Sequence, residues 1–411
     1  MPKPHDVEVI RELAKRVAEI AALPVQEETR RLWRKLNGLE AERPMVMIDQ
    51  ICWNEMNVND ELTLRCEDQE ARRYERQMRM TLFRWKHFPV DMVVEPFIKV
   101  RRAVSDTGFG IRAHDEVAVT DKSNAVKGHL YENQLAKDED LDKIQMPLIS
   151  HDEAQTERNM SFATDLFGDS IELRPWSFVP YVGIWDAITT WMGAEAVLTA
   201  LVDRPDFMHR VAAKMSEGYL RKIDQLEEQG LFGDPQGLIH CTGAYTDELP
   251  ADGYDPARPR ARDRWMFGLA QILGSVSPAM YDEFEITHSR PICERFGLVY
   301  YGCCEPLHDK MGQVRKLPNV RKVSMSPWVD EERGAAEIGK DYVYSRKPNP
   351  AFLATTSFDA EAIREGLTAT RDVCAKHGCA LEFIQKDIST VCYEPRRLFE
   401  WGRIAMEVAR G

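Results

Sequence analysis

The sequence predicts an α/β protein built as a (β/α)8 TIM barrel with a helical extension at its N-terminus. Short apolar runs alternate with helical segments through the C-terminal two-thirds of the chain, an order typical of a parallel sheet with helices outside it. The length of 411 residues suits a barrel with insertions. Frequent repetition of the alternation favours a closed barrel, although the alternation by itself is also compatible with an open sheet.

The first 40 residues predict the helical extension. A stripe of apolar residues with helical spacing predicts a helix over Val7–Leu23, which Pro24 ends, and a second, highly charged helix is expected over Val25–Leu39. The apolar run Pro44–Ile48 is bounded by a proline and an aspartate, so it is the expected first barrel strand. The barrel domain is therefore expected to span residues 41–411.

The rest of the chain supplies the expected barrel elements. Helices are expected over Pro205–Gly230, Pro278–Phe296, Asp330–Ile338 and Asp359–His377. Strands are expected over Gly237–Cys241, Leu298–Tyr301, Val320–Met325, Tyr342–Tyr344 and Ala380–Ile384. The weakly periodic stretch Thr107–Gln155 predicts an excursion of strands and loops over one barrel face.

Composition narrows the class of function. Apolar residues make up 44% of the chain, enough for a large core, and the net charge of −13 disfavours partners that are nucleic acids or anionic membranes. The N-terminus shows no signal peptide, and no apolar run is long enough to span a membrane. Nine cysteines, an odd number, argue against a disulfide framework. We therefore expect a soluble, cytoplasmic protein with free thiols.

Catalytic residues of a barrel lie at the carboxyl ends of its strands. Three segments that follow or end apolar runs carry thiols: Ile239–Gly243, Tyr300–His308 and Ile388–Pro395. Imidazoles occur in the first two of them and carboxylates in the last two. Thiolate and imidazole together suit zinc, which takes about four tetrahedral ligands. The sequence contains no CxxC pair and no HExxH motif, and cysteines often only fill space in a core. The cysteines expected to be core residues are Cys52, Cys66, Cys293, Cys374 and Cys379.

Two adjacent features resemble a known family. The helix that begins Ser277-Pro-Ala-Met-Tyr-Asp-Glu-Phe284 is followed by a strand that ends Tyr301-Gly-Cys-Cys304. This pattern resembles the uroporphyrinogen decarboxylase-like superfamily, and in particular its corrinoid-dependent methyltransferase branch. Phe178–Trp185, Asp91–Glu95 and Lys347–Pro350 are similar to further segments of that family. The resemblance covers the chain from about Arg43 to the C-terminus.

The resemblance implies a zinc site. Cys303 matches the first cysteine ligand of the branch and Cys392, shortly before Pro395, matches the second. Tyr301 stands where the branch has a histidine ligand, so the remaining ligands would come from His240, Glu305 or His308. The arginine-rich motif that holds substrate carboxylates in the decarboxylases has no counterpart after Pro44, which disfavours uroporphyrinogen as the substrate.

The resemblance also implies the reaction. The expected function is zinc-assisted methyl transfer between a small molecule, such as a methoxy, amine or thiol compound, and a corrinoid that is free or carried by a partner protein. Glu95 and Tyr301 are the expected catalytic residues. The side chains expected to bind substrate are Tyr181, Trp185, Thr242 and Trp328.

Two alternatives stay open at this point. The first is a metal-free decarboxylase of a small carboxylated substrate that uses Glu95 and Tyr301 as its polar groups. The second is a non-catalytic barrel that binds a corrinoid or a metal. The sequence also leaves open whether the protein forms a homodimer.

Overall fold

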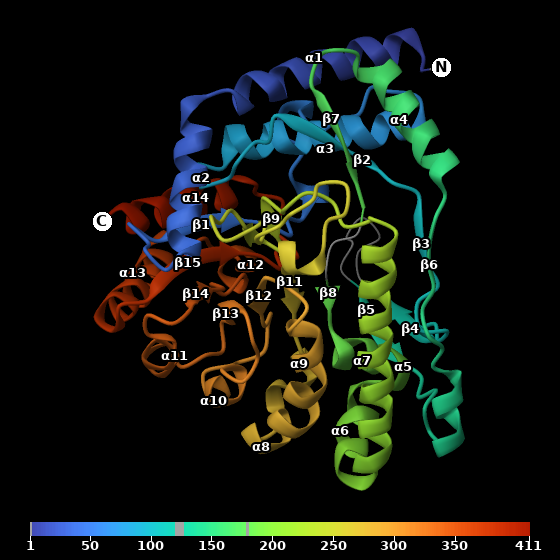
Figure 1. The fold of residues 1–411 in the computed structure, drawn as a ribbon. Helices are drawn as coiled ribbons and strands as arrows, with labels where there is room; N and C mark the ends of the chain where they lie inside the picture. The colour runs from blue at the N-terminus through green and yellow to red at the C-terminus, as the bar shows by residue number, and fades with distance from the viewer. Residues whose placement is uncertain (1, 120–126, 178–180) are drawn as a thin grey trace.

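A seven-stranded parallel sheet forms the centre of the molecule (Figure 1). The structure is a computed structural model that describes residues 2–119, 127–177 and 181–411. The strand order is β1-β15-β14-β13-β12-β11-β8, and all of these pairs are parallel. The strands are β1 Met45–Ile48, β8 Tyr181–Val182, β11 Trp265–Gly268, β12 Leu298–Tyr301, β13 Val320–Met325, β14 Val343–Arg346 and β15 Ala380–Gln385. The predicted α/β class is confirmed.

The sheet joins the beginning of the chain to its end. β1 pairs only with β15 in this sheet, with Met45 opposite Glu382 and Ile48 opposite Gln385. The residues of β1, β12, β14 and β15 are all buried, which is typical of parallel strands covered on both faces. The expected strands at Pro44–Ile48, Leu298–Tyr301, Val320–Met325 and Ala380–Ile384 were therefore placed correctly to within one residue.

A second, separate parallel pair consists of β2 (Phe97–Arg101) and β7 (Glu172–Trp176). Ile98 and Val100 of β2 are buried, whereas Lys99 and Arg101 on the opposite face are exposed. This alternation gives the pair one face that packs against helix α4 (Glu153–Phe167) and one face that is free of that helix. Part of the family-like segment at 178–185 lies outside the described residues.

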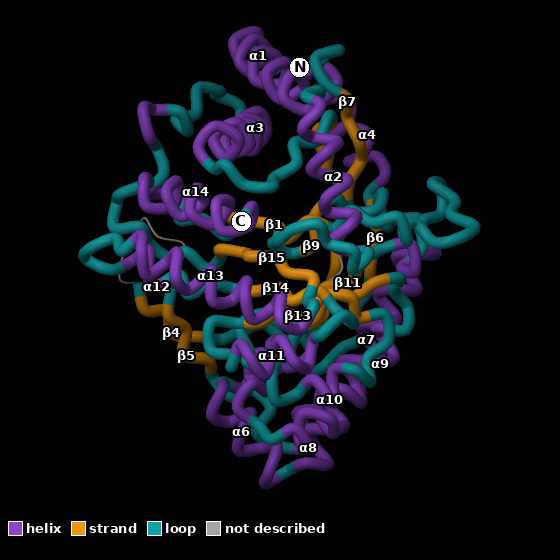
Figure 2. Tube along the Cα trace, turned by 90° about the vertical axis from the view of Figure 1, so that its left-hand side faces the viewer, coloured by secondary structure: helices purple, strands orange, loops and turns teal. Residues whose placement is uncertain are grey.

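Helices cover the outer side of the main sheet. Figure 2 shows α14, α13 and α11 beside the row of strands β1, β15, β14 and β13, and α13 packs against both α11 and α14. The further helices are α3 Gln69–His87, α5 Ile184–Met192, α6 Ala194–Asp203, α7 Pro205–Glu228, α8 Pro278–Met280, a π-helical segment Tyr281–Ile286, α9 Thr287–Cys293, α10 Met311–Val314, α11 Glu331–Ile338, α12 Ala351–Ala354, α13 Ala360–His377 and α14 Arg396–Arg410. Within the described ranges, no helix is both long and apolar enough to cross a membrane.

The N-terminal helices are α1 (Pro4–Ala21) and α2 (Pro24–Asn37), close to their predicted bounds. Each begins with a proline at its first turn, where the missing amide costs nothing. α1 packs against α3 and α4, and the Trp33 indole of α2 donates a hydrogen bond to the Asp91 carbonyl at 2.8 Å. The extension is thus attached to the segment that leads into β2.

The weakly periodic stretch forms two antiparallel pairs, as predicted for an excursion of strands and loops. β3 (Val104–Asp106) pairs with β6 (Ile149–His151), and β4 (Asp115–Ala118) pairs with β5 (Gly128–Tyr131). Both pairs lie along the right-hand side of the molecule in Figure 1.

One of the predicted barrel strands is wrong. The run Gly237–Cys241 does not join the sheet: it forms half of a short antiparallel hairpin made of β9 (Leu238–Ile239) and β10 (Thr242–Gly243). His240 lies in the turn with a φ of 51°, which a continuous strand does not allow. β11, which the sequence analysis did not identify, takes the place in the sheet next to β12.

Candidate active site at the carboxyl edge of the sheet

Side chains from two strand ends meet at the carboxyl edge of the main sheet. Cys303 and Cys304 follow β12, and Lys386 and Asp387 follow β15. The turn of the β9–β10 hairpin adds His240 to this group. We call these five residues the thiolate cluster. Their position is typical of functional side chains, which gather at the carboxyl ends of parallel strands.

The cluster is held by short polar contacts. The Cys303 sulfur lies 3.9 Å from His240 Nε2, 3.6 Å from the Cys304 sulfur and 3.1 Å from Lys386 Nζ. Lys386 Nζ also lies 2.7 Å from Asp387 Oδ2, and the Cys304 sulfur lies 3.3 Å from the same oxygen. One cation therefore faces two sulfurs and a carboxylate.

The surroundings make Cys303 a thiolate. The pKa of Cys303 is held well below its usual range because the Cys304 thiol donates to it and because His240 and the Lys386 ammonium stabilise its charge. These effects outweigh burial, which by itself raises a thiol pKa. The pKa of Cys304 moves in the opposite direction, because that thiol is the donor of the pair.

Two cations balance this thiolate. Burial lowers the pKa of His240, but its hydrogen bonds to the Cys241 and Cys303 side chains raise it overall to about 9. Burial likewise lowers the pKa of Lys386, and the sulfurs of Cys303 and Cys304 raise it overall. At neutral pH the cluster therefore holds an imidazolium and an ammonium beside one thiolate.

The hairpin brings His240 to this edge along the inner side of the sheet. The Gln236 side chain, just before β9, donates to the Trp265 carbonyl at the amino end of β11. His240, at the turn, stacks on Phe267 of β11 with ring centroids 4.0 Å apart. The hairpin thus extends from the amino end of β11 towards the carboxyl edge, where its imidazole faces Cys303.

A cavity that opens to solvent lies beside the cluster. Its volume is about 650 Å³, and it is lined by Tyr131, Tyr181, Gly183, Asp186, Ala187, Thr189, Thr190, Gln271 and Ile272. Tyr181 packs on Phe267, the ring that also stacks on His240. Burial, followed by the nearby Asp186 and Cys303 charges, raises the pKa of Tyr181 to about 12, so its hydroxyl remains a proton donor. Gln271 donates to both oxygens of Asp186 at 3.0 Å and fixes that carboxylate at the cavity wall.

Glu305 lies directly behind the cluster. It is buried, and its two oxygens accept hydrogen bonds from the Cys303 amide at 2.8 Å and the Ala270 amide at 3.1 Å. Burial, together with the Cys303 charge, raises the pKa of Glu305 to about 7. Glu305 therefore orients the loop after β12, and its protonation state is sensitive to pH near neutrality.

Thr242 belongs to a buried polar network rather than to the cavity. Its hydroxyl donates to Glu382 at 2.7 Å and accepts from Lys322 at 3.0 Å, and Lys322 pairs with Glu382 at 2.7 Å. All three side chains are fully buried. Thr242 thus attaches the hairpin to β13 and β15, which positions His240 but gives Thr242 no contact with the open cavity.

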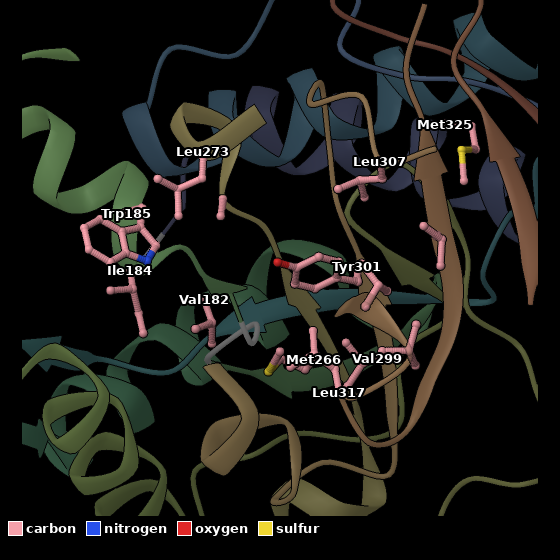
Figure 3. Close-up of a cluster of buried hydrophobic side chains, with 14 of the residues drawn as sticks. Val182, Ile184, Trp185, Met266, Leu273, Val299, Tyr301, Leu307, Leu317 and Met325 are labelled. Atoms are coloured by element: carbon pink, nitrogen blue, oxygen red, sulfur yellow. The ribbon is translucent and has the colours of Figure 1, made fainter. Parts of the chain in front are cut away.

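Two aromatic residues of the expected site lie in the layer between sheet and helices. Figure 3 shows the Tyr301 ring among Leu307, Met266 and Val299. The Tyr301 hydroxyl contacts Tyr281 and donates to Glu285 at 2.9 Å, and Trp185 donates to the Phe284 carbonyl. Successive strand residues point to opposite faces of the sheet. Tyr301 therefore faces the helices, while Tyr300 faces the side of the sheet on which the β9–β10 hairpin lies.

Cys392, Trp328 and Glu95 also lie apart from Cys303. Cys392 is exposed, and its thiol faces the carbonyls of Ala354 and Thr355 at 3.3 and 3.8 Å. Trp328 is 69% exposed in the loop after β13. Glu95 precedes β2 and accepts from the Tyr245 hydroxyl at 2.5 Å. Of the residues expected at the site, the structure brings His240, Cys303 and Glu305 together, with Tyr181 close by.

The ligand set implied for zinc does not fit. Cys392 lies elsewhere, and both oxygens of Glu305 accept backbone amides. The Lys386 ammonium is itself a cation, and it lies against the sulfurs of Cys303 and Cys304, where a zinc ion would have to bind. Over the ranges that the structure describes, no three or more His, Cys, Asp or Glu side chains are arranged to hold a metal ion.

Sequence reasoning missed Lys386, Asp387 and Asp186. Lys386 and Asp387 come one residue after the predicted strand Ala380–Ile384, so the charged residues beyond that strand end were a signal in the sequence. Asp186 follows β8, a two-residue strand that no periodicity marks. For Lys386 and Asp387, the signal available in the sequence was a pair of charged residues just after an apolar run.

Comparison with known proteins identifies the fold. No family model matches the chain, and no curated protein matches it in sequence. Among solved structures, a methyltransferase from Methanosarcina mazei superimposes with a TM-score of 0.50 and 9% identity, over 93% of this chain and 97% of that chain. The two chains therefore share a fold over nearly their whole lengths.

Proposed function

We propose that this protein is a methyltransferase of the uroporphyrinogen decarboxylase-like superfamily, which moves a methyl group between a small molecule and a corrinoid. The shared fold with a methyltransferase supports the enzyme class. The observation that carries the chemistry is the Cys303 thiolate, held between His240 and Lys386 beside an open cavity.

The proposal includes a closed barrel. The Asp91 amide donates to the Val46 carbonyl of β1, and its carboxylate accepts from the Val46 amide, both at 2.9 Å. The segment that leads into β2 thus lies beside β1, and β7, the partner of β2, precedes β8 in the chain. Placing the β2–β7 pair between β1 and β8 supplies the missing side of the ring.

The thiolate cluster can move a proton for either half of a methyl transfer. When a methyl group leaves an oxygen, nitrogen or sulfur atom, the electron pair of the broken bond stays on that atom, and the His240 imidazolium can supply its proton. When the acceptor is a thiol, the Cys303 thiolate can remove the proton and leave a nucleophilic sulfur. Lys386 is the positioning residue, because its charge keeps Cys303 ionised.

The small molecule is expected in the cavity beside the cluster. Tyr181 and Asp186 line this space, and they offer a proton donor and a carboxylate to a bound substrate. The cavity opens to solvent, which fits a bulky corrinoid presented by a partner protein or free in solution. Tyr181 and Ile272 would face that group, whose cobalt centre supplies the methyl acceptor or donor.

The test is methyl transfer to free cobalamin from a panel of methoxy, methylamine and methylthio donors, followed by the change in cobalamin absorbance. We expect His240→Gln and Cys303→Ser each to lower the rate by about 10²–10⁴-fold, the usual contribution of a positioned acid or base. Cys379→Ser is the matched control and should retain activity. Cys379 directly precedes β15, whereas Lys386 directly follows that strand.

Two results would contradict the proposal. The first is transfer that is equally fast in wild type and in both cluster variants, all shown to be folded by circular dichroism. The second is stoichiometric zinc in the purified protein that is lost in both Cys303→Ser and His240→Gln. Such a loss would show that zinc, and not Lys386, is the cation that stabilises the Cys303 thiolate.

A further inference from the structure

We propose that a second cavity, at the amino end of the sheet, binds a small organic anion, namely a carboxylate with an apolar body, through Arg264 and Lys99. The cavity has a volume of about 520 Å³, within the range of ligand sites. It is lined by residues of α2, α3, β2, β7, the hairpin and the start of β11. This site is independent of the proposed methyl transfer.

Arg264 is the principal observation. Its side chain lines the cavity although the residue is only 2% exposed. One terminal nitrogen donates to the Gly233 carbonyl at 2.6 Å, while Nε has no hydrogen-bond partner among the described residues. Burial lowers the pKa of Arg264 to about 10, so the group stays charged at neutral pH. A buried guanidinium is normally paired, because an unpaired buried charge is costly.

Lys99 adds a second positive charge to the same cavity. It lies on the exposed face of β2, lines the cavity, and forms no hydrogen bond or ion pair with any described residue. Burial inside the cavity is the largest cause of its lowered pKa. The Glu95 carboxylate opposes this shift, and repulsion by Arg264 adds to it. Two cations that repel each other across one cavity favour an anion between them.

The other charged groups of the cavity are mostly paired. Arg174 pairs with Glu172 at 2.6 Å and lies over the Phe97 ring. Glu95 is used by Arg30 at 3.2 Å and by the Tyr245 hydroxyl. Asp234 is exposed at the edge of the cavity and attracts both Arg264 and Lys99, and Glu95 also attracts Lys99. Within the described part of the chain, neither acid forms an ion pair with these two cations.

Gly237 allows the hairpin to close this cavity. A Cβ atom at Gly237 would lie 2.5 Å from Glu95 Oε1 and 2.7 Å from the Tyr245 hydroxyl, so a larger residue there would force this pair to move. The Glu95–Tyr245 pair and the hairpin therefore form one wall of the cavity.

The larger part of the lining surface is apolar, and it includes the side chains of Phe97, Trp176, Leu238 and Trp265. Such walls favour a ligand that buries a hydrophobic body, whereas a bare inorganic ion would leave them in contact with water. A carboxylate on an apolar or aromatic body meets both requirements, because a guanidinium binds a carboxylate through charge-assisted hydrogen bonds.

The cavity and the thiolate cluster lie at opposite ends of the sheet. Arg264 precedes β11, whereas Cys303 follows β12, whose residues pair with β11 from Leu298 to Tyr301. The four paired residues of each strand separate the two levels, roughly 13 Å at about 3.3 Å per residue. A ligand in this cavity therefore does not contact Cys303.

Benzoate is the probe, and benzamide is its neutral counterpart of nearly the same shape. Binding to the full chain is measured by calorimetry and by the change in tryptophan fluorescence, because Trp176 and Trp265 line the cavity. We expect saturable benzoate binding, with benzamide and inorganic phosphate at least tenfold weaker. Lys99→Gln and Arg264→Lys should each weaken benzoate about tenfold or more. Arg101→Gln, two residues from Lys99 on the same face of β2 but outside the cavity lining, is the matched control.

The proposal is overturned if wild type binds no benzoate, if benzamide binds equally well, or if Lys99→Gln retains wild-type affinity. Lys99 is exposed, so its variant is expected to fold even if the buried Arg264 variant does not. Methyl-transfer activity is not part of the readout, which keeps failure of this proposal distinct from failure of the proposed function.

Discussion

The two ends of the sheet treat positive charge differently. At the carboxyl edge, Lys386 contacts the Cys303 and Cys304 sulfurs and the Asp387 carboxylate, so its charge is balanced within the protein. At the amino end, Lys99 and Arg264 face one cavity without an ion pair to any described residue. A balanced cation changes the ionisation of its neighbour, whereas an unbalanced one is available to a ligand. The same residue type therefore prepares a reactive group at one end and a binding site at the other.

The largest expected effect compares the two lysines directly. Lys386→Gln should lower the free energy of unfolding by about 1–3 kcal/mol, because it leaves a buried thiolate without its cation. Lys99→Gln should change it by no more than about 0.5 kcal/mol, because Lys99 is exposed and forms no ion pair with a described residue. Urea unfolding at pH 7 measures both, and equal losses in the two variants would remove the distinction between the two ends.

A second expectation concerns the ionisation of Cys303. Its thiolate should persist in the wild type well below the ordinary pKa of cysteine, and Lys386→Gln should move the titration to higher pH. The measurement is the ultraviolet absorbance of the thiolate against pH, taken as the difference between each protein and the same protein carrying Cys303→Ser. Lys99→Gln is the control and should leave the midpoint unchanged. An unshifted midpoint in Lys386→Gln would show that Lys386 does not act on this thiol.

The smallest expected effect concerns Cys392. This exposed thiol faces two carbonyls of the α12 region, so Cys392→Ser should change stability by no more than about 0.5 kcal/mol and methyl transfer by less than about twofold. Parallel rate measurements on Cys392→Ser and Cys303→Ser make the comparison. Similar losses in both would place Cys392 back beside the cluster and revive the two-cysteine zinc site.

The later strands could be predicted because each is a continuous apolar run between helices. β12, β13 and β15 lie where the periodicity indicates them, and the residues after β12 led directly to Cys303 and Glu305. The run Gly237–Cys241 has the same apolar character, but strand periodicity does not distinguish a sheet strand from a hairpin. His240 therefore reaches the cluster by a route that the sequence did not indicate.

The remainder of the site depends on how loops run in three dimensions. Cys392 and Lys386 are only six positions apart in sequence, yet Lys386 joins the cluster and Cys392 lies on the surface. Spacing along the chain cannot decide this, because residues beyond a strand end are no longer constrained by the sheet register. No sequence motif marks Lys99 and Arg264 as cations without an ion pair, because ion pairing depends on which residues the fold brings close together.

The hairpin also has a consequence for the order in which the molecule assembles during synthesis. Thr242 and Lys322 leave the ribosome well before Glu382, the carboxylate that both of them contact. β1, made near the start, likewise waits for β15 as its sheet partner. A nascent chain that stops before β15 therefore lacks the strand that lies between β1 and β14, and its Lys322 ammonium lacks a counter-ion. Completion of the fold is coupled to the arrival of the last strand, and incomplete chains are natural substrates for chaperones and proteases.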